Sequence, residues 1–355
     1  MENIHKDSNF AKVFYFLASI FIFVWALSSL NNILTPIAIA ILIWFLINAF
    51  AEQIKKLPFF NNKTGDFLSI PLSLIIIVYL MFEIGSFIAS SMFALSSTIS
   101  LLDSKVIALI EKLSLLTSFD LVTPLQKIFQ EFSLSTVINK VISAFSNIFS
   151  NIVQILLYVL FLLLDQRFFN AKLNALFPND NHRNKAKHVL TSISNSIKTY
   201  ISITTIISLA TGFLTYFVCE MFSLEGAILW GFIAFVLNFI PTIGSIIAVL
   251  IPVSFALIQF TLIFDVLILF TLLILIQFVL GNIIQPKMMG NKLNISQFVV
   301  ILSLVIWGAM WGTIGMFLSV PLMVILLIIF SQFEHTKSLA ILISGDGSIA
   351  SKNKA

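Results

Sequence analysis

The chain has 355 residues, of which 59% are hydrophobic and only 10% are charged, whereas soluble domains carry about 25% charged residues. So little charge cannot coat a globule in water, and lipid must be the solvent for most of the surface. This composition excludes a soluble enzyme, a nucleic-acid-binding protein and a disordered protein. The excess of 20 Lys and Arg over 16 Asp and Glu is expected where cytoplasmic loops gather basic residues.

Six apolar stretches have the length of ordinary membrane spans, since a spanning helix needs about 20 mostly apolar residues. These stretches are 13–30, 33–50, 69–91, 148–165, 201–219 and 262–283. We expect that the first stretch is not a cleavable signal peptide, because another apolar run follows it at once with no small-residue cleavage site. The pattern predicts an all-α, polytopic integral membrane protein with about six full transmembrane helices.

Two further apolar segments, 225–260 and 298–331, are too long to be single straight spans. Each has more than thirty residues and would measure about 50 Å as a helix, against a hydrocarbon core of about 30 Å. Helix-breaking residues lie near the middle of both: Pro241 and Gly244 in the first, Gly312 and its neighbours in the second. We interpret both as broken, re-entrant hairpins, which makes eight hydrophobic segments; the alternative is two long, kinked spans.

The basic residues orient the spans. The N-terminus, the 51–68 loop and the 166–200 segment carry most of the lysine and arginine and fall on one side when the spans are counted in order. The positive-inside rule makes that side cytoplasmic. A hairpin at 225–260 also brings Lys287 and Lys292 to the cytoplasm, whereas a kinked span would place them outside. Both termini are predicted to be cytoplasmic.

Four regions follow from this reading. Residues 1–91 are N-terminal membrane helices, and residues 92–147 are external amphipathic helices with apolar residues at helical spacing. Residues 148–331 form the main membrane core, which includes a basic, cytoplasmic amphipathic helix at 166–200. Residues 332–355 are a cytoplasmic tail.

Several motifs resemble those of the autoinducer-2 exporter (AI-2E) family. They are Asn-Phe-Ile-Pro-Thr-Ile-Gly at 238–244 with Ile-Pro at 251–252, Pro-Lys-Met-Met-Gly-Asn-Lys-Leu-Asn-Ile-Ser at 286–296, and the Trp- and Gly-rich run 302–315 that leads to Ser-Val-Pro-Leu at 319–322. Asp165 after three leucines, Pro178 and Tyr200 also fit. Gln166 stands where a glycine often follows the aspartate. The resemblance covers most of the chain and is strongest from about 150 to 330.

The resemblance implies a bacterial inner-membrane, multi-pass protein that moves small solutes. Family members resemble exporters of the quorum-sensing signal autoinducer-2, and others look like sodium(lithium)/proton antiporters. It also implies a homo-oligomer. We therefore expect a small polar solute or a monovalent cation or proton as the transported species, and no nucleic acid as a partner.

Hairpins that stop inside the bilayer leave unpaired N–H and C=O groups and helix-dipole ends, which suit a polar solute or a cation. The candidate substrate-binding residues are Asn238, Pro241, Thr242, Gly244, Ser245, Gln277, Asn282, Trp307, Gly308, Gly312 and Gly315. For several of these residues, a purely structural role is the open alternative to solute binding. Asn238 would then buttress its turn, the glycines would allow close packing, and at least one tryptophan would pack. Asn282 lies at a predicted span end and Gln277 lies deeper.

Ionisable residues at membrane depth are candidates for proton or cation coupling. Glu83, Asp165 and Asp265 are the three carboxylates within the six predicted ordinary spans. Glu83 is the deepest, and burial would raise the pKa of its carboxyl. Asp165 and Asp265 lie near span ends, where plain interfacial carboxylates are expected.

An intramembrane enzyme is the competing class. The chain has no His-Glu-x-x-His pair and no Gly-x-Ser-x-Gly turn, and its four histidines lie in polar segments. We therefore expect no enzyme, cofactor or metal site. A scaffold without transport remains as a third hypothesis, although broken membrane helices are costly in an inert anchor.

Overall fold

The computed structural model describes residues 2–57, 68–87, 90, 143 and 150–348, and these residues are helical apart from turns and short connections. The long apolar stretches form helices because a peptide group in hydrocarbon has no water to bind, and a helix pairs its groups within one segment. The predicted all-α architecture is confirmed. The predicted external segment 92–147 lies outside the described residues, apart from Ser143.

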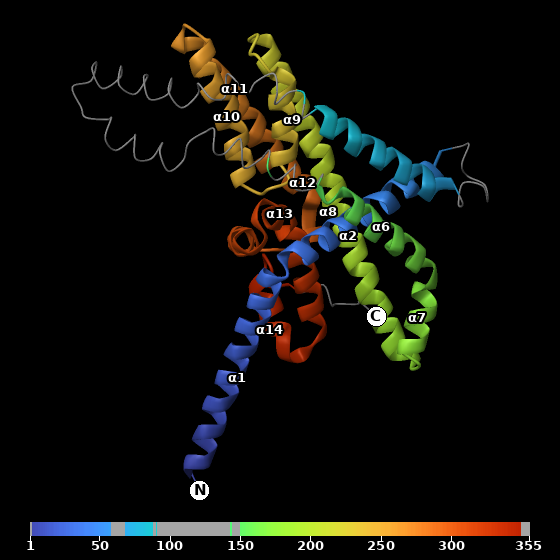
Figure 1. The fold of residues 1–355 in the computed structure, drawn as a ribbon. Coiled ribbons are helices and arrows are strands. Elements are labelled where there is room, and N and C mark those ends of the chain that lie inside the picture. Colours follow the sequence, from blue (N-terminus) through green and yellow to red (C-terminus); the bar gives the residue numbers. More distant parts are fainter. Residues whose placement is uncertain (1, 58–67, 88–89, 91–142, 144–149, 349–355) are drawn as a thin grey trace.

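The N-terminal helices are α1 (Glu2–Ser29), α2 (Asn31–Lys55) and a helix at Leu68–Phe87. Pro36 lies near the start of α2, where few intrahelical hydrogen bonds are lost. α2 packs on α6 (Ile152–Asp165) through Ala40, Ile47, Ile155 and Val159, all with no exposed surface. α1 extends away from the other helices (Figure 1).

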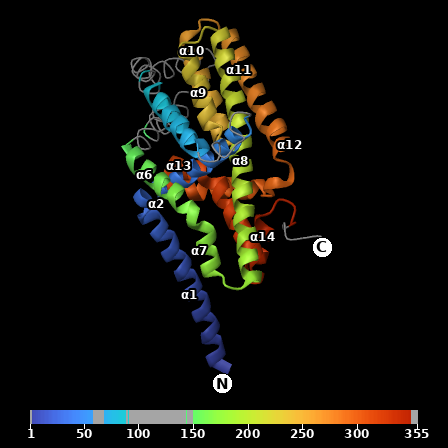
Figure 2. The same cartoon turned by 90° about the vertical axis from the view of Figure 1, so that its right-hand side faces the viewer.

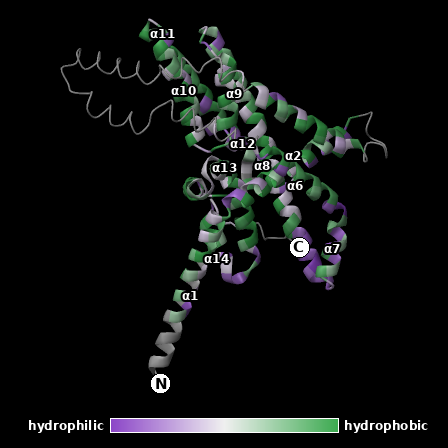
Figure 3. Ribbon diagram, viewed as in Figure 1, coloured by the Kyte–Doolittle hydropathy of each residue, from purple (hydrophilic) through white to green (hydrophobic). Residues whose placement is uncertain are grey.

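The 166–200 segment differs from the prediction of one amphipathic helix. It contains a 3-10 turn (Gln166–Phe168), α7 (Phe169–Leu176) and the start of α8 (Asp180–Met221). Pro178 precedes α8, and Asn179 caps it by accepting a hydrogen bond from the Asn181 amide at 2.9 Å. α8 is one helix of 42 residues, about 63 Å long. The basic stretch and the predicted span 201–219 are therefore one element, polar at its beginning (Figure 3).

α9 (Ala227–Leu237), α10 (Ile243–Gln259) and α11 (Ile263–Gln277) form a bundle with the second half of α8 (Figure 2). Its core contains Trp230, Phe255 and Leu269. A Cβ placed on Gly212 of α8 would lie 2.7 Å from the carbonyl oxygen of Gly231 on α9. Small residues therefore bring these two backbones close together, as they do between other membrane helices.

After α11 the helix continues through a π-helical segment (Phe278–Ile284) and α12 (Gln285–Met289) to a 3-10 turn (Gly290–Leu293). α13 (Gln297–Gln332) is interrupted at Gly312, whose φ of 64° and ψ of −146° are not helical. The Ser303 hydroxyl donates to the Ser319 carbonyl at 3.0 Å, so the two halves of α13 fold back on each other. This geometry excludes the single kinked span considered for 298–331.

The chain ends with a 3-10 turn (Glu334–Thr336), α14 (Lys337–Ile343) and an irregular segment to Ser348. This segment returns to the loop before α13: Ser296 N–H donates to the Ile343 carbonyl at 2.9 Å, and Asn294 hydrogen-bonds Asp346 and Ser348. The C-terminal tail is therefore fastened to the entrance of the second hairpin.

Six helices of the described part are long and apolar enough to cross a membrane. They are Asn31–Lys55, Leu68–Phe87, Ile152–Leu176, Asp180–Met221, Ile263–Met289 and Gln297–Gln332. Five of these correspond to predicted ordinary spans, and the sixth is the broken α13. α1 contains a shorter apolar helix, Leu17–Ser29, within the predicted span 13–30.

Candidate functional site: two broken helical hairpins

The first hairpin turns at residues 238–242, between α9 and α10. Thr242 has a φ of 60°, a strained value for a residue with a side chain. A Cβ on Gly244 would lie only 1.8 Å from the Leu237 carbonyl oxygen, so this position requires glycine. The Ser245 hydroxyl donates to the Thr242 carbonyl at 2.8 Å, which pairs one group of the turn.

Asn238 joins this turn to α8. Its side-chain nitrogen donates to the Ser208 hydroxyl oxygen at 3.0 Å, and Ser208 is fully buried. Asn238 itself is half-buried. Nothing in the sequence pairs these two residues, which are thirty positions apart. The contact gives Asn238 a structural role in holding the turn, alongside the predicted role in solute binding.

The second hairpin turns at Gly312, which is exposed. A Cβ on Gly315 would lie 1.9 Å from the Trp307 carbonyl oxygen, and one on Gly308 would lie 2.9 Å from the Met316 side chain. Gly308 and Gly315 therefore let the two arms pack closely. A Cβ on Gly312 would meet no atom within 4 Å, so Gly312 is needed for its backbone conformation alone.

Trp307 and Trp311 lie one turn apart, with ring centroids 5.1 Å apart. Trp311 is buried, and its indole N–H donates to the Leu27 carbonyl of α1 at 3.0 Å. Trp311 therefore fastens the hairpin to α1, as expected for at least one of the two tryptophans. Trp307 is half-buried and lies closer to the base of its arm.

The two hairpins meet through aromatic rings. Phe239, in the first turn, stacks on Phe317 of the second hairpin, with centroids 5.0 Å apart and an interplanar angle of 26°. Leu304 and Met316 of the second hairpin also pack against the core of the α8–α11 bundle. The tertiary structure thus brings together two motifs that are about seventy residues apart in the chain.

Gln277 and Asn282 lie on α11 and its π-helical continuation, and their environments differ. Gln277 is buried, at 8% exposure, and its side-chain oxygen has no hydrogen-bond donor among the described residues. Asn282 is exposed. Helical structure continues past Asn282 to Met289, so Asn282 does not lie at the end of its helix, and the predicted end of the membrane span near it stays a prediction.

The three candidate coupling carboxylates do not gather at the hairpins. Glu83 is exposed, so the described chain does not provide the burial on which its predicted role depends. Asp165 forms an ion pair with Lys172 at 2.6 Å, and both side chains are more than half exposed. Asp265 is half-buried in the first turn of α11, where the positive end of the helix dipole favours a carboxylate.

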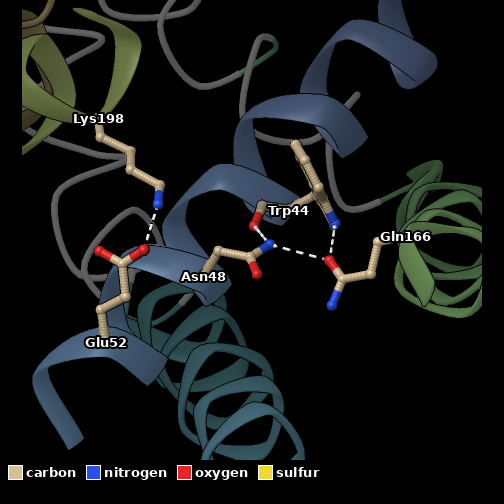
Figure 4. Close-up of polar contacts among 5 residues, drawn as sticks. All are labelled: Trp44, Asn48, Glu52, Gln166 and Lys198. Carbon is tan, nitrogen blue, oxygen red and sulfur yellow. Dashed lines mark hydrogen bonds and ion pairs between the residues drawn. The ribbon is translucent and has the colours of Figure 1, made fainter. Parts of the chain in front are cut away.

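Gln166 takes part in a polar network that sequence reasoning missed. Its side-chain oxygen accepts from the Trp44 indole N–H at 2.8 Å and from Asn48 at 3.4 Å, and Glu52 one turn further on pairs with Lys198 (Figure 4). The network ties α2 to the corner after α6 and to α8. A glycine at position 166 would have no side-chain oxygen to accept these hydrogen bonds. The glutamine that departs from the family pattern therefore helps to hold α2 against the end of α6.

Residues 13–335 match the sequence model of the AI-2E family transporter. The chain belongs to the AI-2E transporter family. The match covers both broken hairpins and the α8–α11 bundle, so the resemblance seen in the motifs is confirmed.

Named relatives of this AI-2E transporter are transport proteins. The AI-2 transport protein TqsA of Escherichia coli is 27% identical over 340 residues, covering 95% of this chain and 96% of that protein. Putative transport proteins of Borreliella burgdorferi and Haemophilus influenzae are 35% and 36% identical over 197 and 209 residues. The alignments cover 54% and 59% of those two proteins. The chain is therefore a multi-pass bacterial inner-membrane transporter and not an enzyme.

Proposed function

We propose that this transporter exports autoinducer-2, or a small hydroxylated organic solute of the same kind, through a site between the two broken hairpins. The observation that carries the proposal is the contact of the two hairpins at Phe239 and Phe317. Similarity to a relative named as an AI-2 transport protein, along 95% of the chain, supports the choice of solute.

The chemistry of the turns supports binding of a polar solute. Interrupted helices in a membrane are tolerated where they are covered by protein or line a watery cavity. Thr242 and Gly312 are exposed at their turns, so peptide groups beside them can meet a solute. The indole of Trp307 and the side chain of Asn282 complete the proposed set of contacts around the turns.

The proposal includes a topology. Both hairpins enter and leave the membrane on one side, both termini lie in the cytoplasm, and the protein works as a homo-oligomer. The C-terminal tail, fastened through Asn294 to the loop before α13, would then mark the cytoplasmic entrance to the second hairpin.

Purified full-length protein in liposomes tests the proposal. Vesicles loaded with autoinducer-2 should release it faster than protein-free vesicles, and a sodium gradient should not drive proton flux in the same preparation. Vesicles that move neither species would support the scaffold hypothesis and defeat the proposal. Sodium-driven proton flux without autoinducer-2 release would show that the protein is an exchanger instead.

A further inference from the structure

Gln277 has a side-chain environment that its role in the fold does not explain. The residue ends the buried stripe of α11 formed with Val266, Leu269 and Leu273. Its side chain is 8% exposed, and the amide oxygen lacks a donor among the described residues. A buried amide without its hydrogen bond destabilises a fold, so a leucine here would serve packing better.

The helix changes form directly after Gln277. Phe278–Ile284 is π-helical, a rare geometry that occurs often at functional sites. Leu280 of this segment packs on Ile203 and Ile207 of α8, which holds one side in place. At Gly281, one turn beyond Gln277, an added Cβ would meet no atom within 4 Å. Open space therefore lies one turn along the helix from the unpaired amide, whose oxygen itself is buried.

Gln277 lies near the level of the first turn. α11 follows α10 through a short connection and packs beside it (Figure 2). Gln277 is the fifteenth residue of α11, and α10 has 17 residues, so the end of α11 returns to the level at which α10 begins. Leu273 shares a core cluster with Leu237 and Ile240 at that turn.

The surroundings of Gln277 identify the class of ligand. Along the helix, Gln277 lies between two apolar clusters: Leu273 belongs to one and Leu280 to the other. Asp265 is the nearest carboxylate on the same helix, about 18 Å away along the axis. A cation would be desolvated here without a countercharge, which is costly, whereas an O–H group would satisfy the amide oxygen.

We infer that Gln277 is a direct polar contact for the transported solute, and that the solute is neutral and donates a hydroxyl hydrogen to the Gln277 side-chain oxygen. The inference rests on the proposed function and narrows its substrate class to uncharged, hydroxyl-bearing molecules. It assigns the open space beside Gly281 to the body of the solute. The π-helical segment then forms one wall of the site, opposite the first turn.

The experiment compares Gln277→Leu with wild type in autoinducer-2 efflux from liposomes. Loss of one hydrogen bond to a neutral ligand should slow efflux at low solute concentration by roughly tenfold. The thermal midpoint in detergent should stay unchanged or rise, because the variant removes an unpaired buried group. Gln154→Leu is the matched control: this amide of α6 bonds Tyr158 at 2.9 Å, and its loss should leave efflux unchanged.

A second readout does not depend on transport rate. In a Cys219→Ala background, Gly281→Cys should react with a small thiol reagent, and autoinducer-2 should slow that reaction severalfold. Unprotected reaction, or Gln277→Leu efflux equal to that of an active wild type, would overturn the inference while the proposed function stands. Efflux lost together with a lowered thermal midpoint would also overturn it, in favour of a structural role. Failure of wild type to release autoinducer-2 would overturn both.

Discussion

Phe239 and Phe317 stack with their ring centroids 5.0 Å apart, and this contact joins the turn of the first hairpin to an arm of the second. Leu304 and Met316 of the second hairpin also pack against the core of the α8–α11 bundle, and each hairpin is closed by its own hydrogen bonds. We therefore expect a change in position of one hairpin to affect the other through this contact.

Truncation of either ring should destabilise the protein and slow transport. Aromatic pairs contribute about 0.5–1.5 kcal/mol beyond the burial of their area, so Phe239→Ala and Phe317→Ala should be non-additive by about 1 kcal/mol in unfolding experiments. Thermal or denaturant unfolding in detergent measures the cycle, and autoinducer-2 efflux measures the functional coupling. Full additivity would show that the rings do not couple the hairpins.

Asn238 and Ser208 test whether the first turn is buttressed from α8. If the hydrogen bond at 3.0 Å is the main role of Asn238, Ser208→Ala and Asn238→Ala should cost about 1 kcal/mol each, and the double variant should cost little more than one. Unfolding free energies measure this non-additivity. A large loss of efflux in Asn238→Ala, with normal efflux in Ser208→Ala, would instead indicate contact of Asn238 with the solute.

Gly312→Ala should destabilise the second hairpin although there is room for the methyl group. The φ of 64° and ψ of −146° lie in a region that residues with a Cβ avoid, at a cost of about 1–3 kcal/mol. Gly308→Ala provides the contrast, since its methyl would displace only the flexible Met316 side chain. A lower thermal midpoint for Gly312→Ala than for Gly308→Ala is the expected result, and equal midpoints would contradict it.

The C-terminal tail should be released in acid. Hydrogen bonds from Ser348 and Asn294 hold the pKa of the Asp346 carboxyl below its ordinary value of 3.8. A pKa lowered by folding means that the stabilisation is present above the ordinary value and is lost as pH falls through the lowered one. Hydrogen exchange of residues 340–348, corrected for intrinsic rates, should show protection at pH 6 that is lost as the pH falls below 3.8. Asp346→Asn should show little of this pH dependence.

The topology of the hairpins can be tested by labelling in intact cells. Lys287 and Met288 are exposed residues of α12, which the re-entrant interpretation places in the cytoplasm. Lys287→Cys and Met288→Cys, in a Cys219→Ala background, should therefore resist a membrane-impermeant thiol reagent added outside. They should react after the cells are broken. Reaction in intact cells would place α12 outside and require 225–260 to cross the membrane.

The sequence by itself determined the environment and the kind of element. Composition and the lengths of apolar runs required helices in lipid, and the motifs around Pro241 and Gly312 identified both helix breaks and the AI-2E family. These properties are local, because each depends on the hydropathy or backbone freedom of a short segment.

The tertiary structure alone decided which residues meet. No local pattern pairs Phe239 with Phe317, or Asn238 with Ser208, because such contacts depend on how separate helices cross. The tertiary structure also placed Glu83 at an exposed position, and it buried the Gln277 side-chain oxygen without a hydrogen-bond donor among the described residues. The position of a residue along its own helix predicts neither the exposure of Glu83 nor the burial of Gln277. Burial depends on which face of the helix other helices cover.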